Sequence, residues 1–83
     1  MRMTRMQQRA AALSAARYHL RQLKVNPLEA SAADAHAVLE EYARRSPEMV
    51  GAQWYRTATE EEITGFYHAW ARWQRQQRRL LLP

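Results

Sequence analysis

The sequence predicts an all-α fold: a small three-helix bundle with room for one further short turn of helix. Only 2 of the 83 residues are Gly and 3 are Pro, which leaves few positions for the tight turns that join β-strands. Three segments also space their apolar residues three and four positions apart, the period of an amphipathic helix. A chain of 83 residues corresponds to a single helical domain over residues 1–83.

The first helix is predicted over about residues 4–23. The segment is rich in the helix formers Ala, Gln, Arg and Leu. Asn26–Pro27 ends it, because the residue before a proline avoids the helical conformation. The apolar positions expected to face the core are Met3, Met6, Ala10, Leu13, Ala16, Leu20 and Leu23.

The second helix is predicted over about residues 32–45. Ser31 and Asp34 have the spacing of a capping box, with a short turn before them. An alternative start has Asn26 as the cap and Pro27 at the first helical position. We favour Ser31.

Residues 28–42 place apolar side chains on one face of this second helix, and opposite charges lie four positions apart on another. Ser46–Pro47 ends the helix and leaves room for one short turn that closes at Gly51. The apolar positions are Leu28, Ala32, Ala35, Val38, Leu39 and Tyr42, and the charged pairs are Glu40 with Arg44 and Glu41 with Arg45.

The third helix, over about residues 60–79, has the clearest start. Thr59 and Glu62 form a capping box, and the acids of the first turn suit the positive end of a helix. Gly65 inside this helix indicates a close approach by a neighbouring helix or by residues 52–56. The apolar face comprises Ile63, Phe66, Tyr67, Trp70, Trp73 and Gln77, followed by Leu80 or Leu81. We expect the three helices to pack antiparallel, with residues 52–58 as the longest connection.

The charges fall into three blocks. Residues 1–25 carry six basic residues and no acid, residues 26–62 carry all eight acids, and residues 63–83 carry four arginines and no acid. The net charge is +5. Such segregation produces surface patches of one sign, which influence partner choice and association rate more than fold.

The sequence offers no chemistry for catalysis, and we expect neither an enzyme nor a cofactor. The chain has no Cys, and His19, His36 and His68 lie on separate predicted helices without a second ligand at metal spacing. No glycine-rich phosphate loop, metalloprotease motif or activated nucleophile is present. No apolar run reaches the roughly 18 residues of a membrane span.

The expected location is the cytoplasm. The absence of Cys fits a reducing compartment but is by itself neutral between compartments. No apolar segment near the N-terminus resembles a signal peptide. Residues 1–25 are Arg-rich, Ala-rich and acid-free, as mitochondrial transit peptides are. An ordinary basic helix of the bundle explains the same composition, and we prefer that interpretation.

Two groups of residues are candidate sites for a protein partner. Arg72, Arg75 and Arg79 form a row on the helix face opposite Trp70, and arginine pairs with carboxylate or phosphate through two hydrogen bonds. Trp54, Tyr55 and Arg56 lie in the long connection, where two adjacent aromatics either cap the core or anchor a partner. Further arginines are candidates for nucleic-acid contacts: Arg5, Arg9, Arg17, Arg21 and Arg78.

The favoured function is stoichiometric binding to a larger protein or to a nucleic-acid-processing complex. Small inhibitors carried by phages and plasmids, such as anti-CRISPR proteins, act in this way, although no motif assigns the chain to them. The alternative is a sequence-independent nucleic-acid-binding protein or transcriptional regulator that uses the arginine rows. A helix-turn-helix reader of base sequence is disfavoured, because Glu60–Glu62 would meet the phosphates. We also expect either a homodimer or a complex with a larger partner, from the small size, the Met-rich start of the first helix and the Leu80–Leu82 tail.

Overall fold

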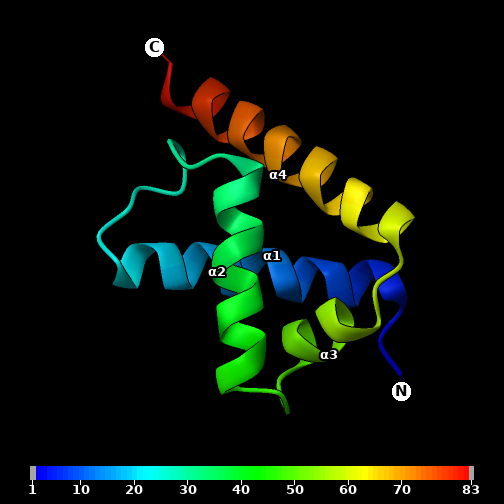
Figure 1. Cartoon of the computed structure of the whole chain (residues 1–83). Coiled ribbons are helices and arrows are strands. Elements are labelled where there is room, and N and C mark those ends of the chain that lie inside the picture. Colours follow the sequence, from blue (N-terminus) through cyan, green and yellow to red (C-terminus); the bar gives the residue numbers. More distant parts are fainter. Residues whose placement is uncertain (1, 83) are drawn as a thin grey trace.

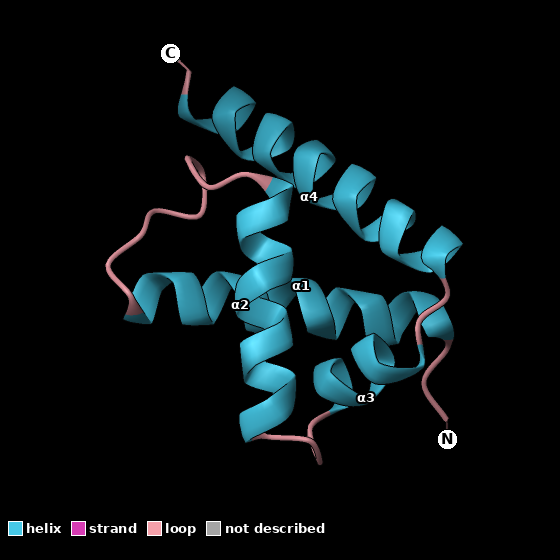
Figure 2. Cartoon of the chain, viewed as in Figure 1, coloured by secondary structure: helices cyan, strands magenta, loops and turns pink. Residues whose placement is uncertain are grey.

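The computed structural model describes residues 2–82, which fold into four α-helices without a strand (Figure 2). The helices are α1 (Arg5–Gln22), α2 (Ala32–Arg45), α3 (Val50–Thr57) and α4 (Glu60–Leu81). The all-α bundle is confirmed, and the three predicted helices correspond to α1, α2 and α4 with ends that differ by at most two residues.

The cap predictions for α2 and α4 are confirmed. The Ser31 hydroxyl accepts a hydrogen bond from the Asp34 backbone N–H, and the Asp34 carboxylate accepts one from the Ser31 N–H. Thr59 and Glu62 make the same reciprocal pair at α4. Asn26 does not cap α2. Its side-chain oxygen accepts from the Leu28 N–H at 3.0 Å and forms a local turn.

Residues 52–58 are not the long connection that was expected. Most of them belong to α3, which begins at Val50 and continues through Gly51, where the sequence predicted only the end of a turn. No side chain caps the start of α3, so the usual sequence signal for a helix start is missing. This helix is instead held by packing, because its Gly51, Ala52 and Trp54 are buried.

The helices do not pack antiparallel. In Figure 1, α2 crosses α1 steeply, and α1 and α4 both run from the right of the view to its left. The C-terminal halves of α1 and α4 therefore lie on the same side of the molecule. Two short contacts fix this arrangement: the Gln74 amide donates to the Pro27 carbonyl at 2.9 Å, and the Arg78 guanidinium donates to the Leu28 carbonyl at 2.6 Å.

The core is built from a few large side chains set among alanines. Trp54, Phe66, Trp70 and Leu39 are fully buried, and α1 and α2 contribute mostly small residues. The Trp70 indole N–H donates to the Ala30 carbonyl at 3.0 Å, which ties α4 to the turn before α2. Nearly half of the buried apolar residues are thus Trp, Phe or Leu. The others are alanines, whose small side chains let helix backbones approach closely.

The predicted core face of α1 is wrong in its N-terminal half. Met3, Met6 and Ala10 are exposed, and α1 instead buries Ala12, Ala16 and Leu20. Leu23, past the end of the helix, is exposed as well. The cause is α3, whose Gly51 lies against the α1 backbone at Ala11 and Ala12. Such a close approach selects small residues over the more hydrophobic methionines.

Gly65 does not mark the close helix contact that was predicted. Outside α4 itself and within residues 2–82, a Cβ atom at this position would meet the end of the flexible Arg9 side chain, at 3.2 Å. The close backbone contact is at Gly51, on a helix that the sequence did not reveal.

Candidate partner-binding surfaces

The arginines divide into those that hold the fold together and those that face solvent. Arg5 belongs to the first group. Its guanidinium makes two hydrogen bonds to the Glu62 carboxylate, at 2.8 and 3.0 Å, and lies 5.8 Å from the centre of the Trp54 ring. Arg5 thus joins the start of α1 to the start of α4, and its guanidinium is engaged within the fold by this ion pair.

Glu62 carries the clearest electrostatic signature of the fold. Hydrogen bonds from Arg5 and from the Thr59 backbone N–H lower the pKa of its carboxyl from 4.5 to about 2. The pKa of Arg5 is raised, mainly by the same hydrogen bond. Of the three acids at residues 60–62, Glu62 therefore forms the ion pair with Arg5, and Glu60 and Glu61 take no part in it.

The lowered pKa of Glu62 predicts an acid-sensitive contribution to stability. Because the pKa is lower in the folded state, the ionised carboxylate favours folding above about pH 4.5, and the contribution is lost as pH falls from 4.5 towards 2. Thermal unfolding of the Glu62→Gln variant should therefore depend less on pH in this window than unfolding of the parent. The Glu61→Gln variant is the control, and an equal effect of both substitutions would contradict the assignment.

Arg17 and Arg78 also have contacts within the fold. The Arg17 guanidinium stacks over the Trp73 ring at 4.7 Å and donates to the Ser14 hydroxyl at 2.9 Å. Burial lowers the pKa of Arg17, and the nearby charge of Arg21 lowers it further. Arg78 donates to the Leu28 carbonyl. Neither side chain has a carboxylate partner among residues 2–82.

The predicted row on α4 is solvent-facing. Arg72, Arg75 and Arg79 are exposed, as is His68, and none of the three arginines pairs with a carboxylate of the described residues. We call the cations on this side of the molecule the basic end. It comprises Arg72, Arg75, Arg78 and Arg79 from α4, Arg17 and Arg21 from α1, and Lys24 just after α1.

The basic end joins the two acid-free blocks of the sequence. Residues 17–24 and 72–79 are far apart in the chain, but α1 and α4 run in the same direction, so their C-terminal halves lie on one side of the fold (Figure 1). The contact of Arg17 with Trp73 is the direct link between them. Cations near helix C-termini also complement the negative ends of both helices, which partly accounts for their position.

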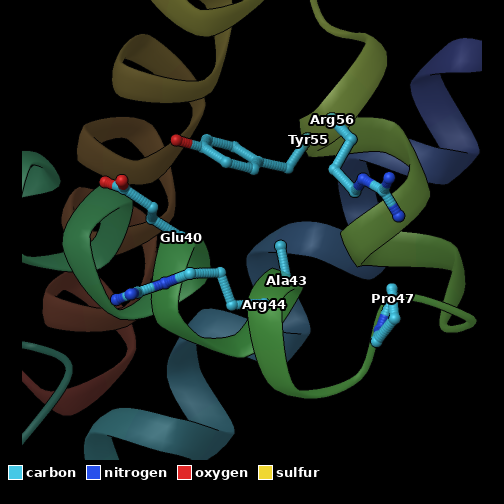
Figure 3. Close-up of a pocket in the computed structure, with 6 residues that line it drawn as sticks. All are labelled: Glu40, Ala43, Arg44, Pro47, Tyr55 and Arg56. Atoms are coloured by element: carbon cyan, nitrogen blue, oxygen red, sulfur yellow. The ribbon is translucent and has the colours of Figure 1, made fainter.

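The second predicted patch, Trp54–Tyr55–Arg56, is split by α3. Trp54 is 1% exposed and packs against Phe66, so it is not available as a surface anchor. Tyr55 and Arg56 face the other way and line a hollow of about 480 Å³ between α2 and α3. Figure 3 shows the Tyr55 ring across this hollow, with its hydroxyl directed towards Glu40 and with Arg56 on the side of Pro47.

The hollow has mixed chemistry. Ala43, Pro47 and the Tyr55 ring give it an apolar lining, while Glu40, Arg44 and Arg56 add charges of both signs (Figure 3). Burial raises the pKa of Tyr55, and the charge of Glu40 raises it further. Arg44 pairs with Glu41 rather than with the expected Glu40, while the predicted Glu41–Arg45 pair is present at 2.9 Å. This lining suits a side chain of a protein partner better than a phosphate backbone.

The histidines have structural neighbours. His36 Nδ1 lies 3.0 Å from the Tyr67 hydroxyl, and the His19 ring packs on Tyr42 with 4.6 Å between ring centres. Within residues 2–82, no three His, Asp or Glu side chains gather as metal ligands would. No helix in that part of the chain is long and apolar enough to cross a membrane.

The remaining predicted nucleic-acid contacts differ in exposure. Arg9 is half-buried and Arg21 is exposed. Arg9 lies beside Gly65, near the start of α4, and is separate from the basic end. Comparisons of the chain with protein-family models, curated proteins and solved structures find no match.

Proposed function

We propose that this protein acts without catalysis, by stoichiometric binding of a larger protein or of a nucleic-acid-processing complex through the basic end. The observation that carries the proposal is the row formed by Arg72, Arg75 and Arg79, which is exposed and has no carboxylate partner within residues 2–82. Other arginines of the chain, such as Arg5 and Arg45, do have one.

The physical argument concerns the energy of like charges. Holding several guanidinium groups on one side of a small fold raises the free energy of the free protein, and an anionic partner relieves that repulsion. Arginine is suited to this role, since its planar fork makes two parallel hydrogen bonds with a carboxylate or a phosphate. In this binding mode, the basic end and an acidic surface of the protein partner guide the encounter through their charges. A side chain of the partner then enters the Tyr55–Arg56 hollow and adds specificity.

An inhibitor of the kind that phages and plasmids carry, including the anti-CRISPR type, is one form of this function. Such a protein occupies a surface of a nucleic-acid-processing machine and needs no active site of its own. A cytoplasmic location would follow from a target of that kind.

The second candidate is sequence-independent nucleic-acid binding or transcriptional regulation through the same basic end. The convergence of cations from α1 and α4 favours it, because a phosphate backbone can contact both helices at once. Glu60 and Glu61 lie in the first turn of α4, about 17 Å from Arg72 and about 25–30 Å from Arg79 at 1.5 Å per residue, so they repel only weakly a strand bound beside the last turn. They would still disfavour entry of the first turn of α4 into a DNA groove.

Charge reversal of the α4 row tests the lead proposal. Replacing Arg72, Arg75 and Arg79 together by Glu should abolish capture of the partner in a pull-down from the native host. Folding should be nearly unchanged, because solvent-exposed substitutions generally alter stability by only about 0.5 kcal/mol each. Far-UV circular dichroism of the variant checks this expectation.

Two matched variants make the result specific. Replacing the same three residues by Lys keeps the charge but removes the paired hydrogen bonds, and should weaken capture without abolishing it. Arg56→Glu tests the hollow alone. If capture survives reversal of the row and is lost in Arg56→Glu, the basic end is not the binding surface.

Binding to random duplex DNA distinguishes the second candidate. Phosphate binding should weaken steeply with salt, with a slope of log affinity against log salt near −0.9 for each phosphate neutralised. Micromolar, salt-sensitive binding that disappears on reversal of the row would favour the nucleic-acid function over the protein partner.

A further inference from the structure

An apolar groove lies on the side of α1 that faces the end of α2 and the start of α3. Its volume is about 530 Å³. Small residues of α1, including Ala15, line it together with the larger Tyr18, Tyr42, Met49 and Val50. Tyr18 is 57% exposed and Met49 is 48% exposed, so these large apolar side chains have little cover in the isolated chain.

The groove continues into a second hollow of about 320 Å³. The two share His19 and Tyr42, and the second adds Leu23 and Val38. Together they make a trough along α1, in the size range of pockets that bind other molecules. The groove is the more apolar part, because the second hollow is also lined by Gln22, Glu41 and Arg45.

The end of α4 is an apolar segment without a partner. Leu80, Leu81 and Leu82, which we call the arm, are 77%, 71% and 70% exposed. Figure 1 shows the last turn of α4 extending past the start of α2. Three consecutive leucines in water carry an unfavourable free energy that burial would remove.

The arm cannot fill the groove of its own chain. Arg78, just before the arm, hydrogen-bonds to Leu28, and Gln74 hydrogen-bonds to Ala30, so the arm leaves from the turn that precedes α2. The groove lies at Tyr42 and Met49, at and beyond the other end of α2. The 14 residues of α2 span about 20 Å, which keeps the arm away from the Met49 end of the groove within one molecule. The second hollow, lined by Ala37 and Val38, reaches back to the middle of α2.

Charges at the two features are complementary. Glu48 is exposed at the edge of the groove, close enough for its charge to raise the pKa of the Tyr42 hydroxyl, after the larger effect of burial. Arg79 is exposed immediately before the arm. Neither has an ion-pair partner among residues 2–82.

We infer that the groove receives the leucine arm of a second copy of this chain, with Arg79 of one copy beside Glu48 of the other, which leaves Arg72 and Arg75 of the α4 row to a further partner. Since every copy has both an arm and a groove, the contact forms twice and closes a two-fold dimer. Binding of each arm in the groove of the other copy increases the buried apolar surface. The gain matters because the small size of the domain limits its own core.

Sedimentation of the full chain over a range of concentrations tests this inference. We expect a dimer, and Leu81→Asp should raise its dissociation constant by at least about tenfold, because a buried leucine contributes that much to binding. Tyr18→Asp in the groove should act in the same direction. Met6→Asp is the matched control, since Met6 is also 71% exposed but belongs to neither feature, and it should leave the dimer unchanged.

The charge pair has its own test. Glu48→Arg and Arg79→Glu should each weaken the dimer, and the chain that carries both changes should recover it. Recovery would show that the two side chains meet across copies, whereas additive weakening would contradict the proposed register.

Because the chain has no Cys, engineered thiols report the contact directly. Met49→Cys in one preparation and Leu81→Cys in another should form a mixed disulfide when they are combined under mild oxidation. A monomer at every concentration would overturn the inference. Disulfides between Leu81→Cys chains alone, or a dimer that only Met6→Asp disrupts, would overturn it equally.

Discussion

Replacing Trp70 by Ala should largely unfold the protein. The Trp70 side chain is fully buried, and it packs between Phe66 and Trp73 while its indole N–H donates to the Ala30 carbonyl. Removing a buried aromatic of this size typically costs about 3–5 kcal/mol. Small domains have a total stability of about 5–15 kcal/mol, and a chain of this length belongs near the lower end.

Chemical denaturation monitored by far-UV circular dichroism measures this loss. Trp70→Phe should be milder, since it keeps most of the packing and since the Ala30 carbonyl still accepts from Gln74. Arg72→Ala, two residues away on the exposed face, is the control and should be close to neutral. If Trp70→Ala unfolds at the same denaturant concentration as the parent, the assignment of the buried face of α4 is wrong.

Gly51→Ala should destabilise the fold by about 1–3 kcal/mol, the usual cost of forcing an extra carbon into a packed core. A Cβ at position 51 would lie 3.0 Å from the Ala12 Cα atom and 3.2 Å from the Ala12 backbone N. Both are backbone atoms that cannot turn aside, so α3 would have to move away from α1. The favourable effect of alanine on helix formation, roughly 1 kcal/mol, offsets only part of this cost.

Gly65→Ala is the matched comparison, because it adds the same methyl group to a helix of the same chain. Among residues 2–82 and apart from the backbone of α4 itself, its close neighbour is the end of the Arg9 side chain, which can rotate away. The helix preference then dominates, and stability should rise by up to about 1 kcal/mol. Thermal melts of the two variants should therefore shift in opposite directions, and a shift in the same direction would refute the proposed packing at Gly51.

Local sequence patterns determine some elements of this fold and not others. The caps at Ser31 and Thr59 and the apolar period of α4 are local features, and the helices that they predict are present. The short helix α3 has no side-chain cap, and it depends on contacts with α1 that no local pattern encodes. The buried face of α1 was misjudged for the same reason, since hydrophobicity favours Met6 while the approach of Gly51 requires Ala12.

Of the candidate surfaces, the sequence alone predicts the α4 row but not the contacts of the other arginines. The solvent-facing row of Arg72, Arg75 and Arg79 follows from the angle between those positions and Trp70 on one helix. The roles of Arg5 and Arg17 depend on Glu62 and Trp73, which are more than fifty residues away in sequence. No spacing rule reveals such pairs, and the burial of Trp54 likewise depends on α3 being a helix that packs into the core.

The aromatic rings of α3 and α4 form a continuous row, and this row gives the protein an optical signature. Ring centres lie 5.9 Å apart from Trp54 to Phe66, 6.4 Å from Phe66 to Trp70 and 5.3 Å from Trp70 to Trp73. Chromophores held so close in an asymmetric core should produce a near-ultraviolet dichroism that depends on the docking of α3 against α4. Helix content dominates the far-ultraviolet signal instead. Loss of the near-ultraviolet signal with retention of the far-ultraviolet signal would therefore identify a state in which the helices persist but no longer pack in a fixed arrangement.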